Sequence, residues 1–268
     1  MNENPKDNIH RLILPNAAGL RGRGIYLLPN LFTSGALFAG FYAIIAATKG
    51  QFEGAAIAIL VAIVLDGLDG RIARLTNTQS DFGAEYDSLA DMVSFGVAPA
   101  VLAYEWMLQD MGKLGFFVAF LYASGAALRL ARFNVQKAVQ DKRYFKGLPS
   151  PSAAALVATF IWTADAKALH GHAGMLALVV LFTVAAALLM VSNVRYHSFK
   201  ELDLRGRIPF ALVFAMVLVF GFISIDPPIM MLLTMTAYTT SGLLLTLGQL
   251  RRSRAERRRE RNAPRDAA

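Results

Sequence analysis

The chain contains no cysteine and comparatively few charged residues. Without cysteine, a disulfide framework, a thiolate metal site and a cysteine nucleophile are all excluded. Charged residues make up 17% of the chain, whereas a soluble globular chain carries about 25%. The sequence also lacks a G-x-G-x-x-G motif and a P-loop. Recognition of a nucleotide through either of these glycine-rich loops is therefore not expected.

Hydrophobic residues dominate instead, at 55% of the chain, and they gather in long runs. Several of these runs are close to the ~20 residues that a helix needs to cross a bilayer core. The sequence therefore predicts an all-α, polytopic membrane protein with about eight transmembrane helices. The runs cover residues 27–48, 54–75, 84–107, 114–135, 152–166, 173–194, 208–225 and 228–250.

Lysine and arginine alternate in density along the connections between these runs. They are frequent before the first run, after the second, fourth and sixth, and after the last. The positive-inside rule then predicts that both termini are cytoplasmic. We expect a cytoplasmic or interfacial arm over residues 1–26, a membrane domain over 27–250 and a basic tail over 251–268.

The net charge of +8 does not point to nucleic acid. Much of the excess lies in the arginine-rich tail, directly after the last apolar run. A basic cluster in that position is typical of a topology signal that also meets anionic lipid headgroups. We expect membrane lipids, and not nucleic acid, to be its partner.

Four aspartates interrupt the second and third apolar runs. Each carboxylate at bilayer depth costs roughly 3 kcal/mol, so four unpaired ones would cost roughly 12 kcal/mol. Asp66 and Asp69 are spaced i, i+3, and Asp87 and Asp91 are spaced i, i+4. Either spacing places both members of a pair on one helical face. Two such faces opposed would form an oxygen-lined cage for divalent metal.

These aspartates belong to a longer pattern, D-x2-D-G-x2-A-R-x8-G-x3-D-x3-D, which begins at Asp66 and ends at Asp91. The pattern resembles the signature of the CDP-alcohol phosphatidyltransferase family, and the chain reproduces it without a departure. The resemblance implies that Asp66, Asp69, Asp87 and Asp91 bind metal. It also implies that Asp91 is the general base that takes the proton from the acceptor hydroxyl. The expected cofactor is Mg²⁺ or Mn²⁺, with Ca²⁺ as a further option, in two ions that clamp the attacking and leaving oxygens.

A second set of residues is expected to contact the nucleotide. Family members carry a P-N-x-x-T sequence similar to the one that starts at Pro29, and its Asn and Thr have groups to contact cytidine or pyrophosphate. The small residues of the aspartate motif allow close backbone approach, and its arginine offers a planar fork to phosphate. The predicted nucleotide contacts are Asn30, Thr33, Gly70, Ala73, Arg74, Thr76 and Ser80.

The sequence around the motif resembles that of one branch of the family, the phosphatidylserine synthases. The stretches that carry this likeness are 87–100, 129–134 and 145–152. The branch implies transfer of the phosphatidyl group from CDP-diacylglycerol to the hydroxyl of L-serine, with release of CMP. We expect an integral protein of the bacterial inner membrane and a homodimer, because dimers are common in this family. The motif ends all fall on the side that the positive-inside rule assigns to the cytoplasm, so we expect the active site to face the cytoplasm.

Serine carries a carboxylate that suits an arginine fork. Arg129 and Arg132 are spaced i, i+3 at the end of the fourth run, where either could hold that carboxylate, hold a phosphate, or anchor the helix on the cytoplasmic side. Further candidates for contacts with serine or phosphate are Asn134, Lys146, Ser150 and Ser152.

Three alternatives to this function are open at the level of sequence. One is the same reaction with another acceptor, such as glycerol phosphate or inositol phosphate. Another is a cation transporter that uses the four aspartates as its ion site. The arginine fixed within the motif argues against a transporter, because ion passage gives no reason for a cation beside the site. The last is a lipid-binding scaffold without catalysis.

Overall fold

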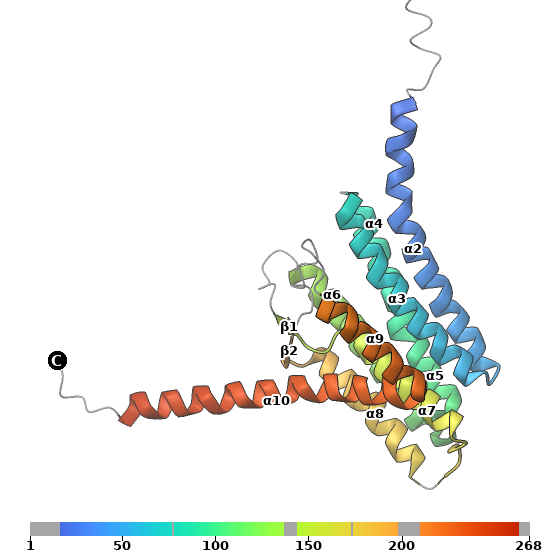
Figure 1. Cartoon of the computed structure of the whole chain (residues 1–268). Coiled ribbons are helices and arrows are strands. Elements are labelled where there is room, and N and C mark those ends of the chain that lie inside the picture. Colours follow the sequence, from blue (N-terminus) through green and yellow to red (C-terminus); the bar gives the residue numbers. More distant parts are fainter. Residues whose placement is uncertain (1–16, 77, 137–143, 173, 198–209, 263–268) are drawn as a thin grey trace, which may run out of the picture.

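The computed structural model describes residues 17–76, 78–136, 144–172, 174–197 and 210–262 (Figure 1). Residues 1–16 of the predicted N-terminal arm and residues 263–268 of the predicted basic tail lie outside this part. Within it, every predicted apolar run falls on helix. The helices are α2 Ala17–Thr48, α3 Phe52–Thr76, α4 Asp81–Asp91, α5 Ala98–Trp106, α6 Lys113–Gln136, α7 Ser150–Ala166, α8 Met175–Val191, α9 Phe210–Ile225 and α10 Pro227–Asn262.

The third predicted run is not one uniform α-helix. It is divided into α4, a turn of π-helix η1 (Met92–Val97) and α5, followed by the short 3₁₀ turn η2 (Leu108–Met111). Two other helices are longer than the sequence indicated. Helix α2 begins at Ala17 and α10 continues to Asn262. The extension of α10 follows from its composition, since Arg, Glu and Ala are strong helix formers.

The prediction of a helical fold is confirmed, with one small addition. Strands β1 (Tyr144–Lys146) and β2 (Arg195–His197) pair antiparallel, with Phe145 opposite Tyr196. This two-stranded ribbon joins the connection before α7 to the connection after α8. Three-residue strands carry too little alternation to be recognised in a sequence.

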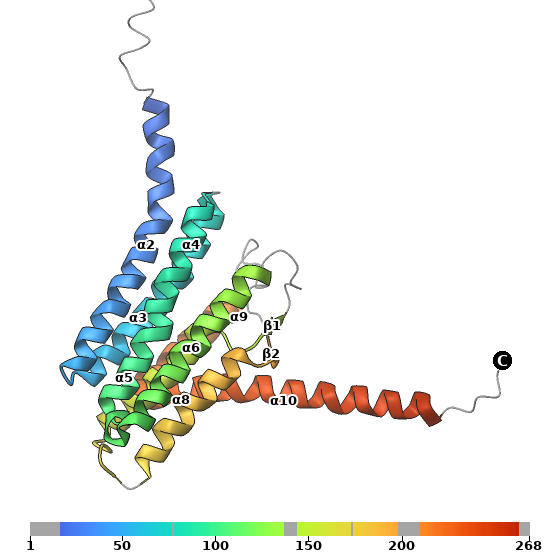
Figure 2. The ribbon, with the colours of Figure 1, turned by 180° about the vertical axis from the view of Figure 1, so that it is seen from behind.

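Helices α2 and α3 lie side by side and form one edge of the bundle (Figures 1 and 2). Their interface consists largely of buried alanines, among them Ala43, Ala47, Ala55 and Ala62. Small side chains let two helix backbones approach closely, which is how helices associate where the surroundings are as apolar as the interface. This close packing holds the C-terminal part of α3, which carries two aspartates, beside the middle of α2.

Helix α7 is the central element of the remaining bundle. It packs against α3, α8 and α10, and ten of its residues from Ala153 to Ala164 are buried. Helix α10 crosses the bundle at a steep angle, and its C-terminal half extends beyond it (Figures 1 and 2). The N-terminal half of α10 therefore lies over α7, although it is far from α7 in the sequence.

Three described helical stretches are long and apolar enough to cross a membrane: Pro29–Thr48, Lys113–Val135 and Pro227–Thr246. Helix α8 is equally apolar but shorter. Large apolar side chains point outward along several helices, as Phe38, Phe120 and Leu181 do. A helical surface of this kind suits contact with lipid chains. The chain is therefore an integral membrane protein, while the count of eight crossings and the cytoplasmic termini stay predictions.

Candidate active site

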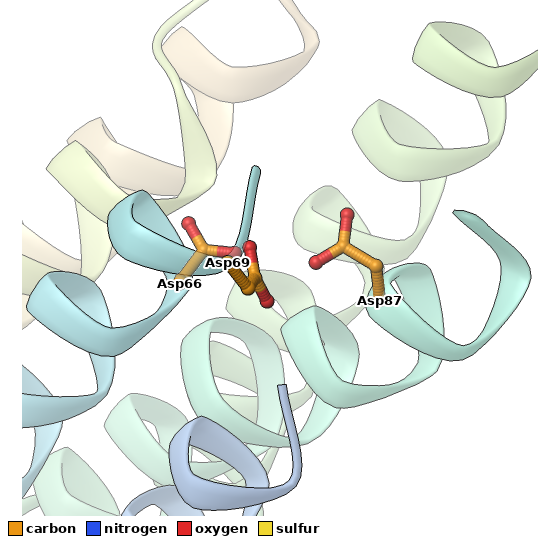
Figure 3. Close-up of side chains that lie close together, drawn as sticks. All are labelled: Asp66, Asp69 and Asp87. Carbon is orange, nitrogen blue, oxygen red and sulfur yellow. The ribbon is translucent and has the colours of Figure 1, made fainter. Parts of the chain in front are cut away.

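Carboxylates from two helices lie close together, two from the C-terminal part of α3 and one from the C-terminal half of α4. One oxygen from each of Asp66, Asp69 and Asp87 lies within 4.8 Å of the other two. Figure 3 shows the carboxylates of Asp66 and Asp69 on α3 facing that of Asp87 on α4. Asp91 lies close enough to interact electrostatically with Asp66 and Asp87. The four aspartates of the motif thus converge, as the helical spacings indicated.

The donor set fits a divalent cation on chemical grounds. Carboxylate oxygens are the ligands preferred by Mg²⁺, Mn²⁺ and Ca²⁺. Three carboxylates this close together repel one another strongly in a partly buried setting, and a cation between them would remove that repulsion. Asp69 is 6% exposed, so its charge in particular needs a partner.

Asp69 has such a partner on the neighbouring helix. The hydroxyl of Thr33 on α2 donates a hydrogen bond of 2.7 Å to Asp69 Oδ2, and it also lies 3.2 Å from the Pro29 carbonyl oxygen. Thr33 is itself buried. The threonine was predicted to contact nucleotide, and the structure gives it a direct contact with the aspartate cluster.

The other predicted nucleotide contacts surround the same rim. Asn30 Oδ1 would lie 3.4 Å from a Cβ placed on Gly83, so the middle of α2 meets the start of α4. Gly70 and Ala73 lie along the last turns of α3, and the Arg74 side chain is exposed beside them.

Two of the predicted contacts have local structural bonds. Ser80 is the N-cap of α4 and accepts a hydrogen bond of 3.0 Å from the Gly83 backbone N–H. Thr76 donates to the Ile72 carbonyl at 2.8 Å and lies 2.7 Å from the hydroxyl of Thr78. These bonds end α3 and start α4, which is an ordinary use of Ser and Thr. Whether Thr76 and Ser80 also bind nucleotide stays a prediction.

The two arginines of α6 point to different places. Arg129 donates to the hydroxyl of Ser150 at the first residue of α7 and interacts electrostatically with Asp66 and Asp91. Arg132 donates to Asn193 Oδ1 at 2.7 Å and to the carbonyl of Val191, the last residue of α8, at 3.4 Å. Arg129 thus lies within electrostatic range of the aspartates, while Arg132 caps a neighbouring helix.

The loop before α7 positions Ser150 next to Arg129. The backbone N–H of Gly147 donates to the Val194 carbonyl at 2.8 Å, and that of Leu148 to the Leu189 carbonyl at 2.9 Å. Gly147 has a φ of +85°, and a Cβ there would lie 2.4 Å from the Met190 carbonyl oxygen. Only glycine fits such a position. The loop is therefore held against α8, which places Ser150 fully buried beside Arg129.

The other three candidates, Lys146, Asn134 and Ser152, lie on three different elements. Lys146 ends β1. Asn134 on α6 donates from Nδ2 to Ser88 Oγ at 3.0 Å, next to Asp87 on α4. The contact between α6 and α4 at Ser88 was not predicted, and neither was Tyr238 on α10, which hydrogen-bonds Ser152. Ser88 could have been noticed by its place between two motif aspartates, whereas nothing near Tyr238 in the sequence resembles a motif.

Directly after Asp91 the chain forms the π-helical turn η1. Ser94 in this turn donates to the Ala36 carbonyl of α2 at 3.0 Å. A Cβ on Gly40 would lie 2.3 Å from Ser94 Oγ and 2.6 Å from Ser94 Cα, so α2 approaches the turn at a glycine. Single π turns are frequent at functional sites, because they shift the register of the side chains that precede and follow them.

Comparison with known proteins agrees with this geometry. The family model described as CDP-alcohol phosphatidyltransferase matches residues 26–191. The CDP-diacylglycerol–serine O-phosphatidyltransferase of Helicobacter pylori is 44% identical over 177 residues, which cover 66% of this chain and 74% of the relative. A protein of the same description from Methanocaldococcus jannaschii is 36% identical over 143 residues, 53% of this chain and 63% of its own. One from Saccharomyces cerevisiae is 44% identical over 137 residues, 45% of this chain and 48% of its own.

Proposed function

Because the chain belongs to the CDP-alcohol phosphatidyltransferase family, we propose that it transfers the phosphatidyl group of CDP-diacylglycerol to the hydroxyl of L-serine, with release of CMP. The observation that carries this proposal is the shared description of relatives from a bacterium, an archaeon and a yeast as CDP-diacylglycerol–serine O-phosphatidyltransferases. The convergence of the four motif aspartates supports it independently.

The aspartate cluster is proposed to hold the divalent metal, Mg²⁺ or Mn²⁺. Asp66, Asp69 and Asp87 offer oxygens within 4.8 Å of one another, and Asp91 adjoins Asp66. When bound, divalent metal neutralises the charge of the pyrophosphate and of the departing CMP. Two ions are expected from the number of carboxylates, and Asp91 would be a ligand of the second ion.

Asp91 is proposed as the general base. Its carboxylate accepts the proton of the serine hydroxyl, whose oxygen attacks the lipid-side phosphorus of the pyrophosphate in line. The bond from that phosphorus to the bridging oxygen breaks, and CMP leaves with the bridging oxygen. The products are phosphatidylserine, CMP and one proton. Thr33 keeps Asp69 oriented during this reaction, and Arg129 balances the negative charge that Asp91 and Asp66 bring into the site.

The nucleotide is proposed to lie along the rim formed by α2, α3 and the start of α4. Asn30, Gly70, Ala73 and Arg74 lie on that rim, and the family model covers all four positions. The distribution of basic residues supports a cytoplasmic position for this rim and for both termini, with residues 27–250 as the membrane domain. A homodimer is the proposed assembly, on family resemblance alone.

One assay tests the proposed function. Purified full-length protein is mixed with CDP-diacylglycerol in detergent micelles, and CMP release is measured with and without L-serine and with and without Mg²⁺ or Mn²⁺. Release that requires both serine and metal is expected. Release with glycerol 3-phosphate or inositol phosphate, and not with serine, would overturn the assignment of serine as the acceptor. The reaction class would still stand.

The transporter and scaffold alternatives have their own readouts. A cation transporter would move metal into sealed vesicles and would ignore CDP-diacylglycerol. A scaffold would bind CDP-diacylglycerol without releasing CMP under any of these conditions. Either result would overturn the proposed function.

A further inference from the structure

Helix α10 contributes a polar side chain to the candidate site from outside the region that the family model matches. That match ends at residue 191, and Tyr238 lies in the N-terminal half of α10, over α7. We propose that Tyr238 is a specificity-determining residue that binds the carboxylate of the acceptor together with Arg129, Ser150 and Ser152. This inference rests on the proposed function, because it assigns the part of the site that recognises serine.

The geometry brings four hydrogen-bonding groups together from three helices. Tyr238 on α10 hydrogen-bonds Ser152 on α7 and interacts electrostatically with Arg129 on α6. Arg129 in turn donates to Ser150, two residues before Ser152. Tyr238 is half-buried, whereas Ser150 is fully buried. These groups therefore form a continuous polar cluster against an otherwise apolar interface between α7 and α10.

The cluster is rich in donors and suits an anion. A guanidinium has only donor groups, and the hydroxyls of tyrosine and serine can each donate. Hydrogen bonds from such groups to a carboxylate are about twice as strong as bonds between neutral partners. Arg129 also interacts electrostatically with Asp91, the proposed base. A serine whose carboxylate meets the cluster would therefore be held by the same arginine that interacts with Asp91.

A specific contact holds α10 in the register that places Tyr238 there. The ring of Tyr196 in β2 lies 5.7 Å from that of Tyr238 between centroids and is fully buried. Its hydroxyl donates to the Thr239 carbonyl at 3.3 Å. One turn further along α10, a Cβ on Gly242 would lie 2.2 Å from the Tyr196 ring, so the ring occupies the space of a missing side chain. The β1–β2 ribbon thereby links Tyr238 to the loop that carries Ser150.

The test is the steady-state kinetics of Tyr238→Phe in the full-length protein. Phenylalanine keeps the ring packed on Tyr196 and removes only the hydroxyl. The KM for L-serine is expected to rise about tenfold or more, because one hydrogen bond to a charged group is lost. The KM for CDP-diacylglycerol and kcat should stay within about twofold. Serinol, which lacks the carboxylate, should be used equally by Tyr238→Phe and by the unmodified protein.

Thr240→Ala is the matched control, because it removes a hydroxyl from an exposed position of the same helix. That hydroxyl donates to the Thr236 and Ala237 carbonyls within α10 and takes no part in the cluster. Its KM for L-serine should stay within about twofold. Ser152→Ala removes the partner on α7 and should raise the KM for L-serine like Tyr238→Phe. The Ser152→Ala kinetics decide the question if Tyr238→Phe fails to fold.

Two results would overturn the inference. An increase in the KM for CDP-diacylglycerol, with the KM for serine unchanged, would mean that the cluster binds a donor phosphate. Unchanged values for both substrates in both variants would mean that Tyr238 only packs α10 against α7. Failure of the proposed function would appear differently, as an absence of serine-dependent CMP release in the unmodified protein.

Discussion

The hydroxyl of Thr33 lies 2.7 Å from Asp69 Oδ2 and connects the first described helix to the carboxylate cluster. The two residues are 36 positions apart and both are buried. A buried carboxylate that accepts one well-oriented hydrogen bond keeps a single rotamer, so its free oxygen is directed at the site. The middle of α2 therefore contributes to the cluster even though α2 contains no acidic side chain.

Replacement of Thr33 with valine should weaken the cluster without removing a carboxylate. Valine has nearly the shape of threonine but cannot donate to Asp69. The concentration of Mg²⁺ needed for half-maximal CMP release should rise about 10- to 100-fold, which is typical for loss of a residue that orients a metal ligand. Thr33→Ser keeps a hydroxyl and is the control. A shift only in the KM for CDP-diacylglycerol would show that Thr33 serves the nucleotide and not Asp69.

Replacement of Asp91 with asparagine should abolish proton transfer while leaving the fold intact. Loss of a general base lowers turnover by about 10²- to 10⁴-fold. Glu85→Gln is the control, because Glu85 lies on the same helix but is exposed. CMP release and binding of CDP-diacylglycerol should be measured on both variants. Turnover at the normal rate in Asp91→Asn would end the assignment of Asp91 as the base.

Replacement of Gly40 with alanine should force α2 away from the π-helical turn η1. The new Cβ would lie 2.6 Å from the Cα of Ser94, a backbone atom that cannot move aside alone. Overpacking of this kind costs about 1–3 kcal/mol, so the midpoint of thermal unfolding in detergent should fall. Activity should fall too, because η1 directly follows Asp91.

Gly54→Ala is the matched control for Gly40→Ala, because a Cβ on Gly54 meets nothing within 4 Å. It should leave the midpoint unchanged or raise it slightly, since alanine is the better helix former by about 1 kcal/mol. Equal midpoints for Gly40→Ala and Gly54→Ala would contradict the close approach of α2 to η1.

Replacement of Arg129 and replacement of Arg132, both on α6, should have different effects on activity and stability. Arg129→Gln removes the positive charge beside Asp66 and Asp91 and should lower CMP release at least tenfold. Arg132→Gln removes the contacts with Asn193 and the Val191 carbonyl. It should lower the midpoint of thermal unfolding and leave the KM for L-serine unchanged. A raised KM for serine in Arg132→Gln, at normal stability, would show that Arg132 binds substrate.

An exposed ion pair should make a small, pH-dependent contribution to stability. The hydrogen bond of 3.0 Å from Lys167 Nζ holds the pKa of Asp226 below its usual value of 3.8. A carboxyl with a lowered pKa in the folded state stabilises the fold above its unfolded pKa, and this contribution is lost as the pH falls through the folded value. The protein should therefore melt at a higher temperature than Asp226→Asn above about pH 4.

The two melting temperatures should converge as the pH falls below 4, and the difference should shrink in high salt because both side chains meet solvent. A difference that stays constant across this pH range would mean that the asparagine acts through packing and not through charge.

The helices and the aspartate cluster were both predictable from the sequence, for the same reason. Each depends on residues close together in the chain. Apolar runs of about 20 residues indicate helices because a backbone surrounded by lipid must satisfy its own hydrogen bonds. Asp66 and Asp69 share a helical face by their spacing alone, as do Asp87 and Asp91. Only the tertiary structure could show that the two faces meet.

The π-helical turn η1 was not predictable, because its cause lies in another helix. Ser94 bonds the Ala36 carbonyl and packs where Gly40 has no side chain. No pattern within residues 84–107 records that contact. The same holds for Thr33, whose sequence setting suggested a nucleotide contact and whose neighbour in space is Asp69.

By itself, the sequence determined that this is a helical membrane protein with a four-aspartate motif, because hydrophobicity and spacing along one helix are local properties. The tertiary structure decided which polar groups accompany that motif. It directs Arg129 toward the carboxylates and Arg132 toward the end of α8, and it brings Tyr238 from the last helix to Ser152. Those choices depend on which helices pack together, and packing between distant segments leaves no periodic trace in the chain.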